Sequence, residues 1–201
     1  MALPWIQSDG GPLVVVPYAR RAGWEGTEPP GGGRVVRATF RWDDAKAKAT
    51  DYDAAVDAAQ QGCGVVRRDG WDALALMRGM KTWRKLRDGV VIVHWESGES
   101  PRAVDAMLVA AFPERPRDEQ PVTWKRTRRR LRVEGPLVMF DAAYRGRLPV
   151  GERFAMAYAK SELKPKRCLR IPLSRGTYAI DEADLEPDAE TLMCLYRLRK
   201  L

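Results

Sequence analysis

The extended segments of this chain are joined by connections that are too short for parallel crossovers. Residues 64–68 and 71–77 flank Asp69-Gly70, a dipeptide typical of a two-residue β-hairpin. Ser174-Arg175-Gly176 forms a similarly tight link between two later extended segments. Parallel neighbours would need a crossover of a dozen or more residues between them. The pattern therefore predicts a mainly antiparallel sheet.

Other runs of β-branched and aromatic residues predict further strands. Residues 5–6 and 13–16 flank a glycine-rich turn, and residues 90–95 are apolar on both faces, which predicts a central strand. Residues 34–42 alternate, with Val36, Ala38, Phe40 and Trp42 on one face. The remaining predicted strands span residues 122–133, 137–142, 153–158, 168–173, 177–180 and 191–198.

Two segments have helical periodicity instead. Within residues 45–61 the apolar residues recur at three- and four-residue steps, which predicts an amphipathic helix over about the second half, ended by Gly62. Ser100-Pro101 is a favourable helix start, with a capping hydroxyl and proline at the first helical position. The apolar stripe of this second helix consists of Val104, Met107, Leu108, Ala111 and Phe112.

Together these elements predict an α+β fold, a predominantly antiparallel β-sheet with about two helices packed on it. At 201 residues and 45% hydrophobic content, the chain is expected to form a single domain over residues 1–201. Residues 23–33, rich in glycine and proline, and residues 113–121 are expected to be flexible loops.

The composition limits where the protein works and what it binds. No apolar run is long enough for a membrane span and no signal peptide is recognisable, so a cytoplasmic location and no membrane partner are expected. The three cysteines, Cys63, Cys168 and Cys194, show neither disulfide nor metal-site spacing. The net charge of +8 either favours an acidic partner or reflects an Arg-rich composition alone.

Little in the chain suggests catalysis. The single histidine, His94, lies in an apolar run and excludes a His-rich metal site. The glycines at 31–33 lack the Lys-Ser/Thr step of a phosphate loop. Carboxylates at Asp43-Asp44, at Asp51 and Asp53, and between Asp181 and Glu190 flank turns and helix starts. We therefore expect no catalytic, metal-binding or cofactor-binding residues and no enzymatic activity.

The sharpest electrostatic feature is the run Lys125 to Arg132. On a strand, Arg126, Arg128, Arg130 and Arg132 share one face, and Lys125 and Arg129 lie on the other, so both faces are expected to be wet over the middle of the segment. Together with Trp124, these four arginines are the candidate partner-binding residues. Three interpretations of this segment remain open. It binds an acidic protein surface, it binds a nucleic acid, or it is a solvated edge strand that its charges protect from aggregation.

Several short motifs, in order, resemble the immunity protein 21 family of bacterial polymorphic toxin systems. Trp24-Glu25-Gly26 fits the family's W-x-G motif, and Tyr52 to Val56 fits its Y-x-x-x-C motif with valine in place of cysteine. We interpret Trp24, Gly26, Tyr52 and Val56 as structural residues. Further similarities are Trp5 to Pro17, Gly64-Val65-Val66, Ala73 to Leu76, Thr82-Trp83, Phe140 to Ala143, Ile171-Pro172-Leu173 and Gly176-Thr177-Tyr178.

The resemblance implies a non-enzymatic protein, without cofactor, that binds and neutralises a co-encoded toxin in the cytoplasm. Two features depart from the family pattern: residues 29–42 look like an addition, and the basic charge is unlike that of an inhibitor facing a basic nuclease site. The alternative function is a basic nucleic-acid-binding or nucleic-acid-associated defence protein acting through Lys125 to Arg132. The third hypothesis, a small hydrolase or transferase using His94 or the acidic clusters, is the least supported by the residues.

Overall fold

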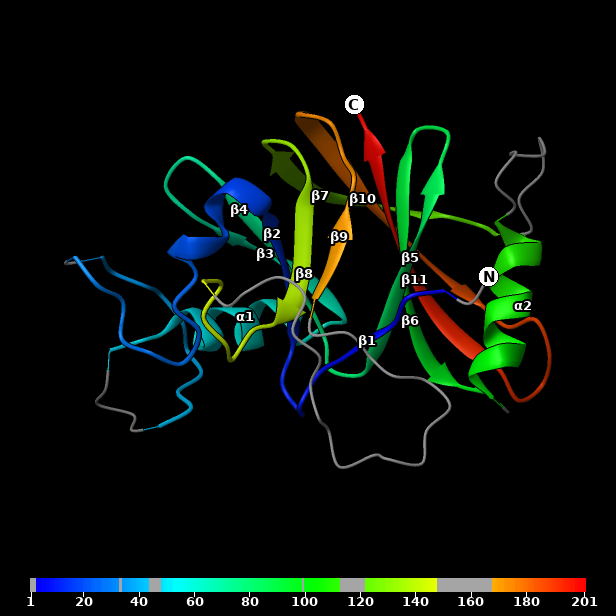
Figure 1. The fold of residues 1–201 in the computed structure, drawn as a ribbon, viewed down its shortest axis with the longest axis horizontal. Helices are drawn as coiled ribbons and strands as arrows, with labels where there is room; N and C mark the ends of the chain where they lie inside the picture. Colours follow the sequence, from blue (N-terminus) through cyan, green and yellow to red (C-terminus); the bar gives the residue numbers. More distant parts are fainter. Residues whose placement is uncertain (1–2, 33, 44–47, 99, 113–121, 148–167) are drawn as a thin grey trace.

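The computed structural model describes residues 3–32, 34–43, 48–98, 100–112, 122–147 and 168–201, which form two antiparallel sheets (Figure 1). The larger sheet, sheet A, has the order β1 (Ile6–Gln7), β5 (Met80–Leu86), β6 (Gly89–Ser97), β11 (Leu192–Lys200), β10 (Gly176–Leu185), β7 (Lys125–Val133). The smaller sheet, sheet B, has the order β3 (Cys63–Arg67), β4 (Asp72–Leu76), β2 (Leu13–Pro17), β8 (Leu137–Asp141), β9 (Cys168–Ile171). All strand pairs among the described residues are antiparallel, as the short connections predicted.

The two sheets and two α-helices form four layers, seen from one side to the other in Figure 1. Helix α1 (Asp51–Ala59) packs on the outer face of sheet B, and α2 (Pro101–Ala111) packs on the outer face of sheet A. The central core lies between the sheets, where side chains from both meet. A short 3-10 helix, η1 (Tyr18–Gly23), follows β2. The predicted α+β class with helices packed on antiparallel strands is confirmed.

The layered arrangement explains why some strands have no polar face. In β2, Leu13 and Val15 enter the core between the sheets, whereas Val14 and Val16 pack toward α1. In β6, Ile92 faces sheet B, and its neighbours Val91 and Val93 face α2. A strand covered on both sides has no solvent face to fill with polar residues. The interior position of β6 confirms the predicted central strand.

Side chains cap both helix starts, of which the sequence predicted the one at Ser100-Pro101. Thr50 caps α1 in a reciprocal capping box with Asp53, each side chain accepting from the other residue's main-chain N–H. Ser100 Oγ accepts from the N–H of Ala103 at 3.2 Å, and Pro101 occupies the first turn of α2. The β3–β4 hairpin closes through Asp69-Gly70, with Gly70 at a φ of +79°.

Residues 34–42 do not form the predicted strand. In this segment the main-chain N–H groups of Thr39 and Phe40 donate to the carboxylate of Asp57, and that of Trp42 donates to Asp53. The α1 carboxylates thus satisfy donors that a sheet ladder would otherwise take. Val36 is buried, but Trp42 is 63% exposed, so the alternating apolar residues do not share one buried face.

Other elements differ from the sequence-based expectation in pairing or extent. The pattern predicts no element over residues 80–86, where β5 forms, because its lysines and arginine interrupt the apolar pattern. The strands flanking the first glycine-rich turn belong to different sheets, since β1 pairs with β5 and β2 with β4 and β8. The predicted strand 153–158 and loop 113–121 lie outside the described residues. Among those described, no helix is long and apolar enough to cross a membrane.

Candidate partner-binding surface

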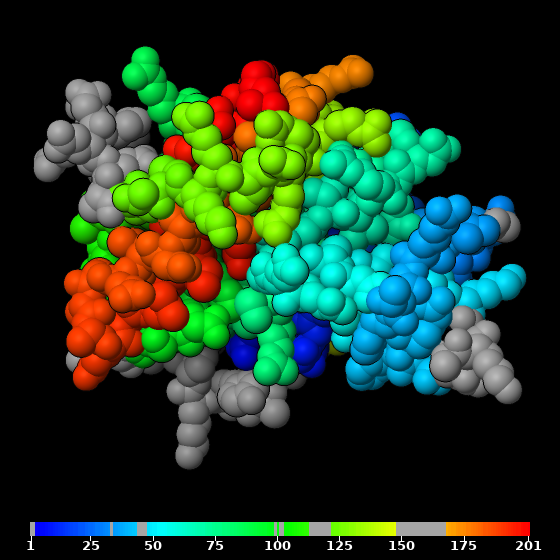
Figure 2. Space-filling view, turned by 180° about the vertical axis from the view of Figure 1, so that it is seen from behind, coloured from blue at the N-terminus to red at the C-terminus, as the bar shows by residue number. Residues whose placement is uncertain are grey.

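Strand β7 forms one edge of sheet A, hydrogen-bonded to β10 on one side. Its even-numbered residues, Arg126, Arg128, Arg130 and Arg132, are all exposed. Leu131 and Val133 on the other face are buried in the core between the sheets. Figure 2 shows the yellow-green side chains of this segment standing out over the face of the molecule that it views.

A bulge separates the two halves of this strand. Arg130 lies opposite Ala179, and Arg126 lies opposite Asp181. The four-residue advance along β7 therefore matches a two-residue advance along β10, which leaves extra residues in β7. Thr127 holds the extra residues in place: its hydroxyl donates to the carbonyl of Ile180 and accepts from the N–H of Arg129. Bulges of this kind twist an edge strand and interrupt its pairing potential.

Three of the arginines have no acidic partner among the residues that the structure describes. These are Arg126, Arg128 and Arg130; within the described part of the chain, the guanidinium group of Arg130 donates to main-chain carbonyls of its own strand. Their guanidinium groups are therefore available to carboxylates or phosphates of another molecule.

The other two arginines of the strand are engaged inside the protein. Arg132 donates from its main chain at 2.8 Å and from its guanidinium at 3.2 Å to Asp72, a fully buried carboxylate in β4. Arg129 is half-buried and forms an ion pair with Glu182. The expectation that both faces of this segment are wet is therefore wrong for Arg129, whose side chain turns toward β10 and Cys63.

Trp124 is half-buried and already stacked. The guanidinium carbon of Arg197 lies 4.4 Å from the centre of its ring, and its indole N–H is buried without a hydrogen-bond partner. Arg197 and Arg199 both bind Asp181. Burial would raise the pKa of Asp181, but the two guanidinium groups together hold it below its usual range. A base or ligand ring would have to displace Arg197 to use that face of the indole.

The W-x-G and tyrosine motifs lie far from β7, inside the layer between sheet B and α1. Trp24 is fully buried and its indole N–H donates to the carbonyl of Ala142 at 2.9 Å. Tyr52 is 7% exposed and its ring contacts Phe40 and Trp42 edge-on. Val56 is half-buried against the same cluster.

Gly26 ties these two motifs to the main chain. Its φ is +65°, and a Cβ at this position would lie 2.3 Å from the carbonyl oxygen of Ala143. Its own carbonyl accepts from the N–H of Tyr52 at 3.0 Å, the first turn of α1. Only glycine combines this backbone conformation with so close an approach. All four motif residues thus have packing or backbone roles in the structure.

The residues considered for chemistry are dispersed. Asp51 binds Arg34 and Arg68 at the start of α1, Asp53 caps that helix, and Asp181 binds two arginines. Asp43 is exposed, and Asp44 is not among the described residues. Gly31 and Gly32 lie in an irregular loop. Asp51, Asp53 and Asp181 are therefore explained by arginine partners and by helix capping.

His94 is 3% exposed in β6, with its Nε2 atom 3.3 Å from Glu96 and its Nδ1 atom buried without a partner. Burial, together with the smaller effect of the Lys81 charge, lowers its pKa to about 3. Lys81 itself is fully buried, with a pKa that burial lowers to about 7. The sequence alone does not single out Lys81, because only the strand register places it opposite His94.

Comparison with known proteins gives one match. The family model described as Immunity protein 21 matches residues 4–191, nearly the whole chain. No curated protein and no solved structure matches the chain.

Proposed function

The chain belongs to the immunity protein 21 family, and we propose from this membership that it is a non-enzymatic immunity protein. It binds a cognate toxin of a bacterial polymorphic toxin system in the cytoplasm and blocks the toxin by direct contact. The family match over residues 4–191 is the observation that carries this proposal. Asp51, Asp53 and Asp181 are bound by arginines or cap a helix, which supports a structural role for these carboxylates rather than catalysis.

We place the toxin-binding surface on the exposed side of β7. Arg126, Arg128 and Arg130 line one edge of sheet A and form no ion pair with any described carboxylate. Planar guanidinium groups on alternate residues suit bidentate pairing with carboxylates, so the partner surface is expected to be acidic. An acidic toxin surface also agrees with the net charge of +8.

Trp124 and Arg132, the other candidate residues, support this surface rather than contact the toxin. Arg132 is held by Asp72, and the indole of Trp124 is held by Arg197. Both interactions join the ends of β7 to neighbouring strands. A strand fixed at both ends is already ordered before binding, so presenting its three free arginines costs little backbone entropy.

The function is tested with the toxin domain encoded beside the gene. We expect the two purified proteins to form a stable complex, and co-expression to restore growth of cells that produce the toxin. Absence of both complex and protection, with a folded protein, would contradict an immunity role.

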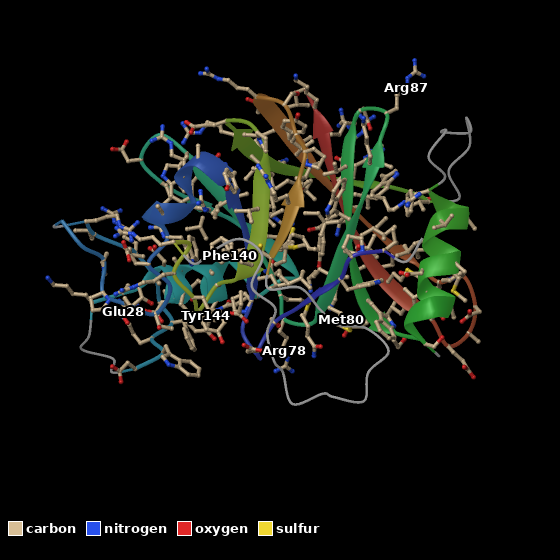
Figure 3. All side chains as sticks on the ribbon, viewed as in Figure 1. Glu28, Arg78, Met80, Arg87, Phe140 and Tyr144 are labelled. Carbon is tan, nitrogen blue, oxygen red and sulfur yellow. The ribbon has the colours of Figure 1, made fainter. Side chains whose placement is uncertain are left out.

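The surface is tested by charge reversal. The variant Arg126→Glu, Arg128→Glu, Arg130→Glu should bind the toxin with markedly slower association, because exposed charges steer encounter. The matched control reverses Arg37, Arg78 and Arg87, which are exposed away from β7; Figure 3 shows Arg78 and Arg87 on opposite sides of the molecule. Equal association rates for the two variants would remove β7 from the interface and leave the family assignment intact.

Nucleic-acid binding is the alternative function, favoured only by the three unpaired arginines. Arginines that neutralise phosphates would release counterions from the nucleic acid, so binding would weaken steeply with salt. The stacking of Arg197 on Trp124 argues against it, because one face of the aromatic side chain beside the arginines is covered. A mobility-shift assay over a salt series, with the same two variants, distinguishes this function from toxin binding.

A further inference from the structure

A row of polar side chains crosses the inner face of sheet A at one end. The strand register aligns Lys81 of β5, His94 of β6, Cys194 of β11 and Asp184 of β10. The equivalent row two residues along, Trp83, Ile92 and Tyr196, packs into the core between the sheets. The polar row therefore begins where the apolar core ends. Arg78 and Met80, labelled in Figure 3, mark this end of the molecule.

Three of the side chains at this end offer metal-binding atoms close together. Glu96 follows His94 by two residues on the same strand, and the His94 Nε2 and Glu96 Oε2 atoms are 3.3 Å apart. Cys194 lies directly opposite His94 on β11. The imidazole nitrogen, the carboxylate oxygen and the thiol sulfur all lie within 4.8 Å of one another.

We propose that His94, Glu96 and Cys194 form a binding site for a zinc-like divalent ion. Imidazole, thiolate and carboxylate are the three ligand types that zinc prefers. Two nitrogen or oxygen ligands, each about 2.0–2.1 Å from a tetrahedral ion, lie about 3.3–3.4 Å apart. The separation of 3.3 Å between His94 and Glu96 matches this spacing. The single histidine excludes a His-rich site but not this mixed one.

The surroundings supply access and a neighbouring carboxylate. Cys194 and Asp184 line a pocket of about 370 Å³, through which an ion and its remaining water ligands can reach the sulfur. The Cys194 thiol hydrogen-bonds to Asp184, which is exposed and can orient the sulfur or act as a fourth ligand. Glu96 is 46% exposed, so its side chain can adjust without disturbing the core.

Lys81 is the feature that opposes a cation here. It is fully buried beside this group, and among the described residues its ammonium group donates to the carbonyl of Arg78 at 3.2 Å. The carboxylate of Glu96 contacts His94 instead. The carboxylate is therefore not already used as a close ion-pair partner of the lysine. Repulsion between Lys81 and a bound ion predicts that removing the amine strengthens metal binding.

The test uses tag-free, chelator-treated protein titrated with Co²⁺, a spectroscopic substitute for zinc. We expect one equivalent of Co²⁺ to give the near-ultraviolet thiolate charge-transfer band and the visible bands of tetrahedral cobalt, both removed by one equivalent of Zn²⁺. Cys194→Ser should abolish the charge-transfer band. Cys168→Ser, which changes a cysteine on β9 of sheet B, should keep it.

Two further variants decide the outcome if Cys194→Ser does not fold. Glu96→Gln alters a half-exposed side chain and should weaken Co²⁺ binding by more than about tenfold. Lys81→Met should strengthen it. Any one of three results would overturn the proposal. The wild-type protein could show no charge-transfer band, or folded Cys194→Ser could keep the band. The third result is an unchanged Co²⁺ affinity in both Glu96→Gln and Lys81→Met.

Discussion

The carboxylate of Asp72 accepts the main-chain N–H of Arg132 at 2.8 Å and thereby joins the two sheets at the edge strand β7. Asp72 is fully buried at the start of β4, and its oxygens also bind the guanidinium groups of Arg132 and Arg67. The carboxylate is thus surrounded by donors from both sheets. This contact holds one end of the arginine-bearing strand in place without using Arg126, Arg128 or Arg130.

Replacing this carboxylate should destabilise the protein. Asp72→Asn keeps the shape but removes the charge, and the loss of charge-assisted bonds should lower the free energy of unfolding by about 1–3 kcal/mol. The lower part of this range allows for solvent around the two arginines, whose side chains are more than half exposed. Urea unfolding measures the change. Asp69→Asn, in the exposed hairpin turn, is the control and should be nearly neutral.

Tyr52 should be a major stability determinant of the layer between sheet B and α1. Its ring lies against Phe40, Trp42 and the main chain at Gly11, so Tyr52→Ala would leave a large cavity. We expect a loss of about 3–5 kcal/mol in the free energy of unfolding. Val56→Ala, on the half-buried side of the same helix, should cost clearly less. An unchanged melting temperature for Tyr52→Ala would contradict this role.

Elements governed by local rules could be predicted from the sequence. Thr50 and Ser100 with Pro101 define helix starts through bonds within three residues, and Asp69-Gly70 closes a hairpin whose strands are adjacent in the chain. The apolar run of β6 likewise indicates burial on both faces. Periodicity and turn chemistry are sufficient in each of these cases.

Elements governed by distant partners could not be predicted in the same way. The alternation of residues 34–42 resembles a strand, but the carboxylates of Asp53 and Asp57 on α1 take its main-chain donors. Lys81 interrupts the pattern of β5, yet it is buried because β5 pairs between β1 and β6. The grouping of His94, Glu96 and Cys194 depends on the register between β6 and β11, which no local signal specifies.

Gly26 and Gly32 allow backbone strain and steric clash to be separated. Both have a φ of +65°, but a Cβ at Gly26 would lie 2.3 Å from the carbonyl oxygen of Ala143, whereas nothing lies within 4 Å at Gly32. Gly32→Ala should therefore cost about 1–2 kcal/mol, the penalty of the left-handed conformation alone. Gly26→Ala should cost distinctly more, because a main-chain carbonyl must move. Equal unfolding free energies for the two variants would mean that Ala143 gives way freely.

The buried amine of Lys81 should make stability depend on pH in the alkaline range. Burial lowers its pKa from 10.5 to about 7, against the opposing attraction of the Glu96 and Cys194 charges. Between about pH 7 and pH 10.5 the unfolded chain therefore binds a proton at this residue that the folded chain does not. Stability rises with pH wherever the unfolded state binds more protons.

Below about pH 7 the amine is protonated in both states, and the full cost of burying its charge is present. The free energy of unfolding should accordingly increase from pH 7 toward pH 9 in the wild-type protein, with chelator present to exclude bound metal. Above pH 9, the ordinary pKa of a thiol, Cys63 and Cys194 oppose this rise, because burial raises their pKa values and the unfolded chain loses thiol protons that the folded chain keeps. Lys81→Met retains the length of the side chain without the charge, so its stability should rise less over this interval and exceed that of the wild type at pH 7. Urea unfolding at several pH values measures both effects. Parallel pH profiles for the two proteins would show that Lys81 keeps an ordinary pKa, and that water or a neighbouring carboxylate solvates its ammonium group in the folded state.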